Sequence, residues 1–503
     1  MITGARRTAL LPSVAVMIMM LIITGCSGGG DPRPTPSGSP SPERKFTIMT
    51  TDSIKTTDPA AVADTGSTML TQNVFQRLMT ADPTAGALKP DAARDCIFES
   101  KTTYECTLRP DLKFSNGDKL TSADVKFSIQ RATRLDVPGS SASLLGSLRR
   151  IETPDDTTVR FILSRYDTQF PWALAAPGAS IVDRTVYNSD EVAAIDDPIV
   201  GSGPFTVDKI SKDQVELAKF LDYTGYAPAQ VGNAVIRTMP DSASIEEAMA
   251  KHQTDVVWRG LSTAAQQRLQ AQINASKNNR SKAGFSQTAL PGARVQQLIW
   301  NPDSKHRESY ALRSAIAGAL QEDRTLDSVV PNNIPGHKAS FPLGGRAKIN
   351  VTWNNRIQLT LGYDPSAPNS LDLANQIRTR LEDTGGLSVL LRPSDDTADL
   401  QLTDRKAWTS TGLAWLQPVL EDPIKEEASS IAKADARARQ AGDGTAQLNA
   451  ALAELQSIAA SEKVVLPISQ TSEYVYAADN TTVTANAFGP GWQLGLWGMK
   501  VER

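Results

Sequence analysis

A strand–helix–strand pattern around residue 370 constrains the fold of this chain more than any other feature. Residues 356–362 alternate Ile and Leu with other side chains, as a half-buried strand does. Ser370 is predicted to cap a helix that carries Leu373, Ile377 and Leu381 and stops at Gly385-Gly386, and residues 387–391 are the next predicted strand. Joints this short make the unit a right-handed parallel crossover. The sequence therefore predicts an α/β fold with a parallel sheet.

Other segments add elements around this unit. Thr121 has the spacing of a capping box with an acidic residue three positions later, which predicts a helix over 122–134. Ser244 has a similar spacing. Periodicity predicts a strand over 45–51, helices over 69–78 and 310–320, and an exposed helix over 425–455.

The composition excludes several classes of protein. The chain has 503 residues, enough for about three domains' worth of core, and is 40% hydrophobic and 21% charged. These values argue against a disordered chain, a collagen or a multi-span membrane protein. A net charge of −3 provides no electrostatic reason to expect nucleic acid as a partner. Only three Cys and three His are present, so neither a disulfide-dense scaffold nor a Cys/His zinc module is expected.

The N-terminus has the features of a secretory signal. Arg6 and Arg7 precede an apolar run over 9–23, which is short for a bilayer span. Small residues directly before Cys26 resemble a bacterial lipobox, which implies cleavage before Cys26 and lipid, including palmitate, on that residue. An ordinary secretory signal with an incidental Cys is the alternative. Two or three acyl chains would anchor the protein stably on the extracytoplasmic side of the cell membrane.

Residues 26–45 are expected to be a linker rather than part of the fold. Thirteen of the 19 residues over 27–45 are Gly, Pro or Ser. Such a segment has too little apolar area to form a core. We therefore expect a signal peptide over 1–25 and a tether over 26–45.

Cys96 and Cys106 enclose a segment that fits a hairpin centred on Lys101. In that pairing Cys96 faces Cys106, and Phe98 faces Tyr104 on the same side. A disulfide would persist outside the cytoplasm. Two free thiols in a core strand remain the alternative, and in either case the pair is structural.

A search for catalytic motifs finds none in a suitable context. The single Gly-x-Ser-x-Gly match lies over 25–29, without a preceding strand or a following helix. The sequence has no phosphate-binding loop and no GxGxxG. His252, His306 and His337 are far apart in the sequence. We predict no enzyme, no cofactor and no metal.

Several segments together resemble the extracellular solute-binding proteins of ABC importers, family 5, whose members bind dipeptides, oligopeptides or nickel. The most specific match is YECTLRP over 104–110, followed by KFSNG over 113–117 and TSADVKFS over 121–128. Weaker matches are GSGPF over 201–205 and LRSAI over 312–316.

The resemblance implies a bilobal, periplasmic-binding-protein-like fold (class II, Venus-flytrap) with an extra subdomain in lobe one. Lobe one would comprise residues 46–290, with 471–503 returning to it, and lobe two would comprise 291–470. A cleft between two lobes can bury most of a small solute, and hinge closure can be coupled to binding.

Five residues are candidate ligand contacts. Trp258 and Arg259 end a predicted strand, on the side where α/β proteins bind ligands; a core Trp and a solvated Arg are the alternative. In peptide binders of the family, an Asp in the segment after a strand of the second lobe can hold the ligand amine. Here that segment reads ADLQLTDRKAW over 398–408, in which neither Asp404 nor Trp408 matches the family motif cleanly, and both are candidates to face the cleft. Trp492 could line the cleft or pack in the core.

These features predict a monomeric, lipid-anchored solute-binding subunit of an ABC importer. It would capture an oligopeptide or another small polar solute and deliver it to a membrane permease. A degenerate member acting as a surface receptor or scaffold is one alternative, and an extracellular hydrolase is another.

Overall fold

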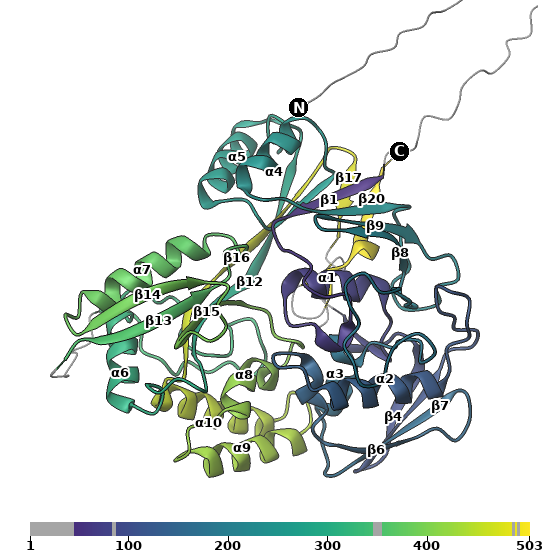
Figure 1. Cartoon of the computed structure of the whole chain (residues 1–503), viewed down its shortest axis with the longest axis horizontal. Helices are drawn as coiled ribbons and strands as arrows, with labels where there is room; N and C mark the ends of the chain where they lie inside the picture. The colour runs from purple at the N-terminus through teal and green to yellow at the C-terminus, as the bar shows by residue number, and fades with distance from the viewer. Residues whose placement is uncertain (1–44, 83–86, 346–354, 485–487, 490–492, 503) are drawn as a thin grey trace, which may run out of the picture. The chain divides into compact units, whose positions relative to one another are not determined.

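Figure 1 shows the computed structural model of the protein. The structure describes residues 45–82, 87–345, 355–484, 488–489 and 493–502. The predicted signal peptide, Cys26, the linker up to residue 44 and Trp492 lie outside the described residues.

A ten-stranded mixed sheet runs through the described body. In spatial order its strands are β14 (Leu387–Pro393), β13 (Ile357–Tyr363), β15 (Leu400–Arg405), β12 (Ser286–Trp300), β16 (Val465–Ala477), β11 (Val256–Trp258), β1 (Phe46–Thr50), β10 (Ala234–Thr238), β9 (Gln214–Lys219) and β8 (Phe205–Ser211). β13 pairs in parallel with β14 and β15, and β1 pairs in parallel with β10 and β11. The predicted parallel unit around residue 370 is therefore confirmed.

β12 and β16 are the long strands that connect the two ends of this sheet, as Figure 1 shows. They pair antiparallel from Ser286 opposite Ala477 to Ile299 opposite Val465. The pairing shifts between Leu290 and Arg294, where Gly292 has a φ of +70°. An irregularity of this kind bends a strand pair.

The remaining described strands form smaller sheets. A four-stranded sheet orders β4 (Ala93–Ser100), β5 (Thr103–Leu108), β7 (Thr158–Leu163) and β6 (Leu148–Glu152). The two-stranded pairs are β2 (Met79–Asp82) with β3 (Ala87–Pro90), β17 (Thr481–Val483) with β20 (Met499–Val501), and β18 (Phe488–Gly489) with β19 (Gln493–Leu494).

The described α-helices are α1 (Thr65–Val74), α2 (Ser122–Leu135), α3 (Phe170–Ala173), α4 (Ser242–Ala250), α5 (Thr263–Ala275), α6 (Tyr310–Ala319), α7 (Ser370–Glu382), α8 (Gly412–Glu421), α9 (Ala428–Gln440) and α10 (Ala446–Glu462). The predicted capping box of α2 is present, since the Thr121 backbone N–H donates to Asp124 Oδ2 over 2.8 Å.

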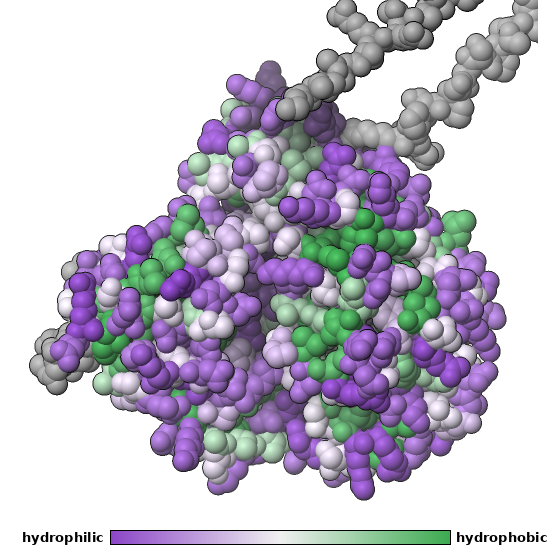
Figure 2. All heavy atoms as spheres, in the orientation of Figure 1, coloured by the Kyte–Doolittle hydropathy of each residue, from purple (hydrophilic) through white to green (hydrophobic). Residues whose placement is uncertain are grey.

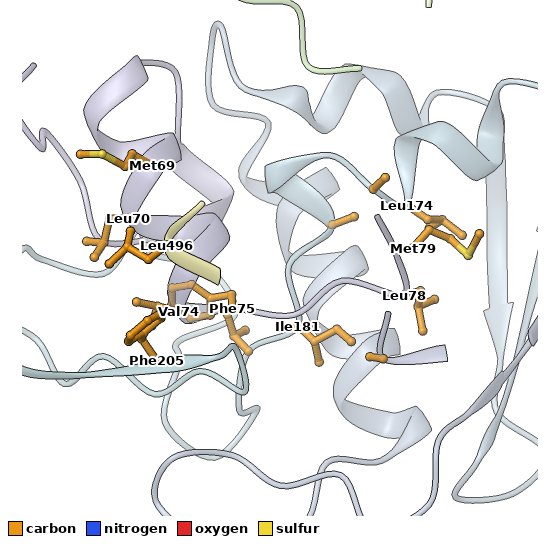
Figure 3. Close-up of a cluster of buried hydrophobic side chains, with 14 of the residues drawn as sticks. Met69, Leu70, Val74, Phe75, Leu78, Met79, Leu174, Ile181, Phe205 and Leu496 are labelled. Atoms are coloured by element: carbon orange, nitrogen blue, oxygen red, sulfur yellow. The ribbon is translucent and has the colours of Figure 1, made fainter. Parts of the chain in front are cut away.

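Two large hydrophobic clusters divide the body. The first contains residues from 46–293 and from 475–499, and the second contains residues from 295–468. Figure 3 shows part of the first cluster, where α1 side chains meet Phe205 and Leu496. A smaller third cluster packs α4 and α5 against β1 and β11. We call the part around the first and third clusters the first lobe and the part around the second cluster the second lobe.

Four local expectations need correction. Asp241, not Ser244, caps α4, because its carboxylate accepts from the Ser244 backbone N–H. Asn369 is the N-cap of α7, and Ser370 is its first residue. The helix expected over 69–78 ends at Val74.

Residues 425–455 contribute to a helical hairpin, α9 and α10, rather than one exposed helix. Its small apolar side chains, such as Ala434 and Leu455, are buried in the second cluster.

The hairpin β4–β5 has the predicted pairing. Cys96 lies opposite Cys106 and Phe98 lies opposite Tyr104. The two cysteines are joined by a disulfide with a Cα–Cα distance of 4.1 Å. The rings of Phe98 and Tyr104 pack with centroids 4.7 Å apart. This hairpin belongs to the first lobe and does not line the cavity described below.

Candidate functional site

A cavity of about 400 Å³ lies between the two lobes. Figure 2 shows the hollow between them on one face of the molecule. The first lobe contributes Asp52, Lys55, Asp64, Thr68, Arg259 and Gln493, among others, and the second contributes Tyr363, Asp364, Asp395, Asp404, Arg405, Lys406, Trp408 and Glu421. Its volume falls in the range of about 300–1,000 Å³ that is usual for small-molecule sites.

The cavity is built from the carboxyl ends of parallel strands in both lobes. Asp52 follows β1 and Arg259 follows β11 in the first lobe, while Tyr363, Ser394 and Arg405 end or follow β13, β14 and β15 in the second. Ligands of open α/β sheets bind at such ends. The carboxyl-terminal strand ends of both lobes therefore face the same cavity.

Arg259 is the centre of a buried charge cluster on the cavity wall. Its side chain is 1% exposed, and its guanidinium contacts three carboxylates: Nε lies 2.6 Å from Asp52 Oδ2, Nη2 lies 2.9 Å from Asp404 Oδ2, and Nη1 lies 3.1 Å from Glu473 Oε2. Asp404 belongs to the second lobe and Asp52 to the first. One cation therefore links both lobes.

Two further cations complete this cluster. Lys406 Nζ lies 2.9 Å from Glu473 Oε2 and also donates to the Ala293 carbonyl, and Arg294 Nε lies 3.3 Å from Asp404 Oδ2. Three cations thus balance three carboxylates, which offsets the cost of burying them. The cluster lies beside the bend between Leu290 and Arg294, where β12 and β16 pass from one lobe to the other.

The local backbone turns Arg259 into the cluster. Arg259 has a φ of +64°, in the left-handed region, and Gly260 follows with a φ of +88°. At this φ a side chain is strained, and a Cβ on Gly260 would also lie 3.0 Å from the backbone nitrogen of Thr51, so the position favours glycine. Because the backbone turns sharply directly after β11, the side chains of Trp258 and Arg259 point in different directions.

The cluster shifts the pKa values of its carboxyl groups in opposite directions. Burial raises the pKa of Asp52 to about 6, against the opposing effect of Arg259. Burial also disfavours the charge on Asp404, but Arg259, Arg294 and Lys406 outweigh it and hold the pKa of Asp404 below its usual value. Arg259 and Lys406 lower the pKa of Glu473 in the same way.

The structure brings together three of the five candidate ligand residues. Arg259, Asp404 and Trp408 all line the cavity. Arg259 and Asp404 also pair with each other, which the sequence did not indicate.

Trp258 is placed differently from the prediction. Its side chain is fully buried in the first hydrophobic cluster, and it is not among the residues that line the cavity. Successive strand residues face opposite sides, so Trp258 packs inward. Trp492 lies outside the described residues, whereas its neighbour Gln493 lines the cavity.

Sequence reasoning missed most of the charged residues around the cavity. The sequence signal that could have identified some of them is their position at or just after the end of a strand, as for Asp52, Arg405 and Lys406. Burial lowers the pKa of Arg405 to about 9, and its Nη2 donates to the Ala414 carbonyl over 2.7 Å. Glu473 had no signal, because its partner Arg259 is 214 residues away.

A second set of contacts joins the lobes through the turn between α9 and α10. Asp443 accepts from Gln169 Nε2 over 3.0 Å and from Trp172 Nε1 over 3.1 Å. The Thr168 backbone N–H donates to the Arg439 carbonyl over 2.8 Å, and its hydroxyl donates to the Ala441 carbonyl over 2.6 Å. The lobes are therefore in contact at a second place, away from the Arg259 cluster.

The described residues include no histidine on the cavity wall and no group of three or more His, Cys, Asp or Glu side chains arranged to hold a metal ion. Among those same residues, no helix is both long enough and apolar enough to span a bilayer.

Comparison with known families decides where the chain belongs. The model for bacterial extracellular solute-binding proteins, family 5 Middle, matches residues 87–371, more than half of the chain. The chain is a member of this family. The resemblance seen in the motifs over 104–128 is therefore confirmed.

Curated relatives match over part of their length. A probable D,D-dipeptide-binding periplasmic protein of Escherichia coli K12 is 25% identical over 300 residues, which cover 58% of this chain and 55% of the relative. A probable ABC transporter periplasmic-binding protein, SapA, from the same strain is 23% identical over 283 residues, which cover 52% and 50%. The chain thus spans about half the length of these two family 5 relatives.

Solved structures show the same fold. A periplasmic binding protein of Helicobacter pylori, in complex with the peptide STSA, superposes with a TM-score of 0.77 at 18% identity and covers 91% of this chain and 98% of its own. A binding protein from Agrobacterium, in complex with agropinic acid, has a TM-score of 0.78 at 18% identity and covers 91% and 99%. The predicted fold class, α/β and bilobal like the periplasmic binding proteins, is confirmed.

Proposed function

We propose that this protein is the extracytoplasmic solute-binding subunit of an ABC importer. It captures a short peptide or another small polar solute in the cavity between its lobes and delivers it to a membrane permease. The carrying observation is the cavity of about 400 Å³, whose wall comes from both lobes and is rich in charged side chains. Such a wall suits a solute with several polar groups.

The size of the cavity favours a short solute. Its volume is near the lower end of the usual range for small-molecule sites. Trp408 and Tyr363 add aromatic surface for the apolar parts of the solute. Membership of family 5 supports the transport role, since its members are extracellular solute-binding proteins.

The proposal includes the anchor and the lobe boundaries. Cys26 carries the lipid, residues 26–45 form the tether, and the lobes meet near residues 290 and 470. The division of the hydrophobic clusters at 293–295 and 468–475 supports these boundaries. If Cys26 is lipidated, the protein partitions into detergent and Cys26→Ala does not; equal partitioning of both forms would contradict the anchor.

A surface receptor or scaffold that takes no solute is the second candidate. It is favoured by one observation: Arg259 and Asp404, which a transport protein could turn toward its solute, are paired with each other. The binding experiment separates the two roles.

The experiment is native mass spectrometry of protein purified from its own host, followed by thermal denaturation with a panel of short peptides and small polar solutes. A solute at 100 times its Kd should stabilise the folded state by about 2.7 kcal/mol. Ser366→Trp, which places an indole in the cavity, should abolish the shift. The control, Ser461→Trp on the exposed end of α10, should retain it. If no solute co-purifies and no panel member shifts the wild-type Tm, the transport proposal fails.

A further inference from the structure

A small recess adjoins the main cavity on the first-lobe side. It is lined by Thr68, Gln72, Arg77, Ala175, Pro177, Ala407, Trp408 and Gln493. Four of these residues, Thr68, Ala407, Trp408 and Gln493, also line the main cavity. The recess measures about 10 Å³, space for a single water-sized group.

Arg77 stands out among the buried arginines of the described part of the chain. The other buried arginines each have an ion pair or a hydrogen bond from the guanidinium: Arg131, Arg259, Arg294, Arg307, Arg313 and Arg324. Arg77 is 3% exposed, and its side chain forms neither with any described residue. Burial lowers the pKa of Arg77, and Asp91, which is not in contact with it, offsets this effect only in part. A buried charge without a direct partner is costly.

The polar neighbours of Arg77 are also incompletely paired. Gln72 Nε2 and Gln493 Oε1 are buried without a hydrogen-bond partner, and both residues are 3% exposed. Burial of an unsatisfied polar atom costs free energy. The recess therefore presents a cation, an amide donor and an amide acceptor that require a polar partner.

We propose that this recess binds the carboxylate of the transported solute, with Arg77 as its counter-ion and Gln72 as a second donor. This inference rests on the proposed transport function and names the chemical class of its substrate. Gln493 accepts from an N–H group next to the carboxylate, as at the C-terminus of a peptide. The recess has room for one carboxylate oxygen, and the rest of the solute lies in the main cavity, which Gln493 also lines.

The recess also links binding to closure of the lobes. Arg77 and Gln72 belong to the first lobe, and Ala407 and Trp408 belong to the second. A carboxylate bound at Arg77 is covered by Trp408 only when the lobes are together. The bound solute thereby favours the closed form, because it contacts both lobes only in that form.

The test compares matched short peptides with a free or an amidated C-terminus, together with simple carboxylic acids, by calorimetric titration. For the wild type we expect the free acids to bind about 10- to 100-fold more tightly than the amides, the usual effect of a hydrogen bond to a charged group. Arg77→Met should remove this preference, and Arg77→Lys should retain part of it. Binding of simple acids without peptides would identify a non-peptide carboxylate as the ligand.

Arg324→Met is the matched control, since Arg324 is 4% exposed and lines neither the recess nor the cavity. It should leave the preference for free acids unchanged. Arg77→Met without solute should be at least as stable as the wild type, because burial disfavours the charge of Arg77 by more than Asp91 offsets. A purely structural role of Arg77 would instead lower the Tm of that variant.

The outcomes separate the two proposals. Equal binding of acids and amides by the wild type, or an unchanged preference in Arg77→Met, overturns the carboxylate site and leaves the transport function standing. Failure of every solute to bind the wild type overturns both.

Discussion

At the scale of single residues, the decisive feature is the pairing of buried charges around Arg259. Removing Arg259 leaves Asp52, Asp404 and Glu473 close together with less compensation. We expect Arg259→Met to lower the free energy of unfolding by about 3–5 kcal/mol, as for other broken buried ion pairs. Urea denaturation measures the change.

The control for this prediction is an exposed pair. Arg268 pairs with Glu246 over 2.8 Å, but its side chain is 57% exposed. Arg268→Met should change the free energy of unfolding by less than about 1 kcal/mol. A similar loss in both variants would mean that burial does not set the strength of the Arg259 cluster.

Asp52 makes the stability depend on pH. Because burial raises its pKa to about 6, the folded state binds a proton that the unfolded chain has lost between about pH 4 and pH 6. The stabilisation from this proton is present below that window and is lost as the pH rises through about 6. The difference in Tm between the wild type and Asp52→Asn should therefore change between pH 4.5 and pH 7, with the Tm of the wild type falling relative to that of the variant. A difference that is flat with pH would contradict the shift.

At the scale of elements, the hairpin β4–β5 is a local unit with its own constraint. The disulfide between Cys96 and Cys106 closes a short loop of the unfolded chain. The Cys96→Ala, Cys106→Ala double variant should lose roughly 2–3 kcal/mol of stability. Reductant should destabilise the wild type in urea by a similar amount and leave the variant unchanged.

Solute binding should survive the same change, since the hairpin does not line the cavity. Loss of binding in a variant that is still folded would show that the four-stranded sheet positions the site. The hairpin was predictable because its pairing is set by residues only ten apart.

At the scale of the whole molecule, the contacts of Asp443 bear on lobe closure. Asp443 receives two hydrogen bonds from the first lobe, through Gln169 and Trp172. Asp443→Ala should favour the open form. Without solute, this should enlarge the radius of gyration measured by small-angle X-ray scattering. It should also weaken solute binding in proportion to the decrease in the fraction of closed protein.

Asp479→Ala is the matched control. Asp479 pairs with Arg280 inside the first lobe over 2.9 Å, and its side chain is 71% exposed. That change should leave both the radius of gyration and the affinity for solute unchanged. Equal scattering from Asp443→Ala and the wild type would show that the hydrogen bonds of Asp443 are not needed to keep the lobes together.

The sequence by itself determined the features that depend on near neighbours. The capping box at Thr121, the parallel unit around Ser370, the pairing of Cys96 with Cys106 and the motifs of the family all lie within about 30 residues. Short-range hydrogen bonds and hydrophobic periodicity leave a readable pattern at that distance.

The tertiary structure alone decided the site. Trp258 and Arg259 are adjacent in the sequence, yet one packs in the core and the other lines the cavity. Arg259 meets Asp52, Asp404 and Glu473 only because β1, β11, β15 and β16 converge where the lobes join. Charges pair through space, and no local pattern records which distant partner neutralises a buried group. For the same reason, Arg77 shows its lack of a partner only in the folded protein.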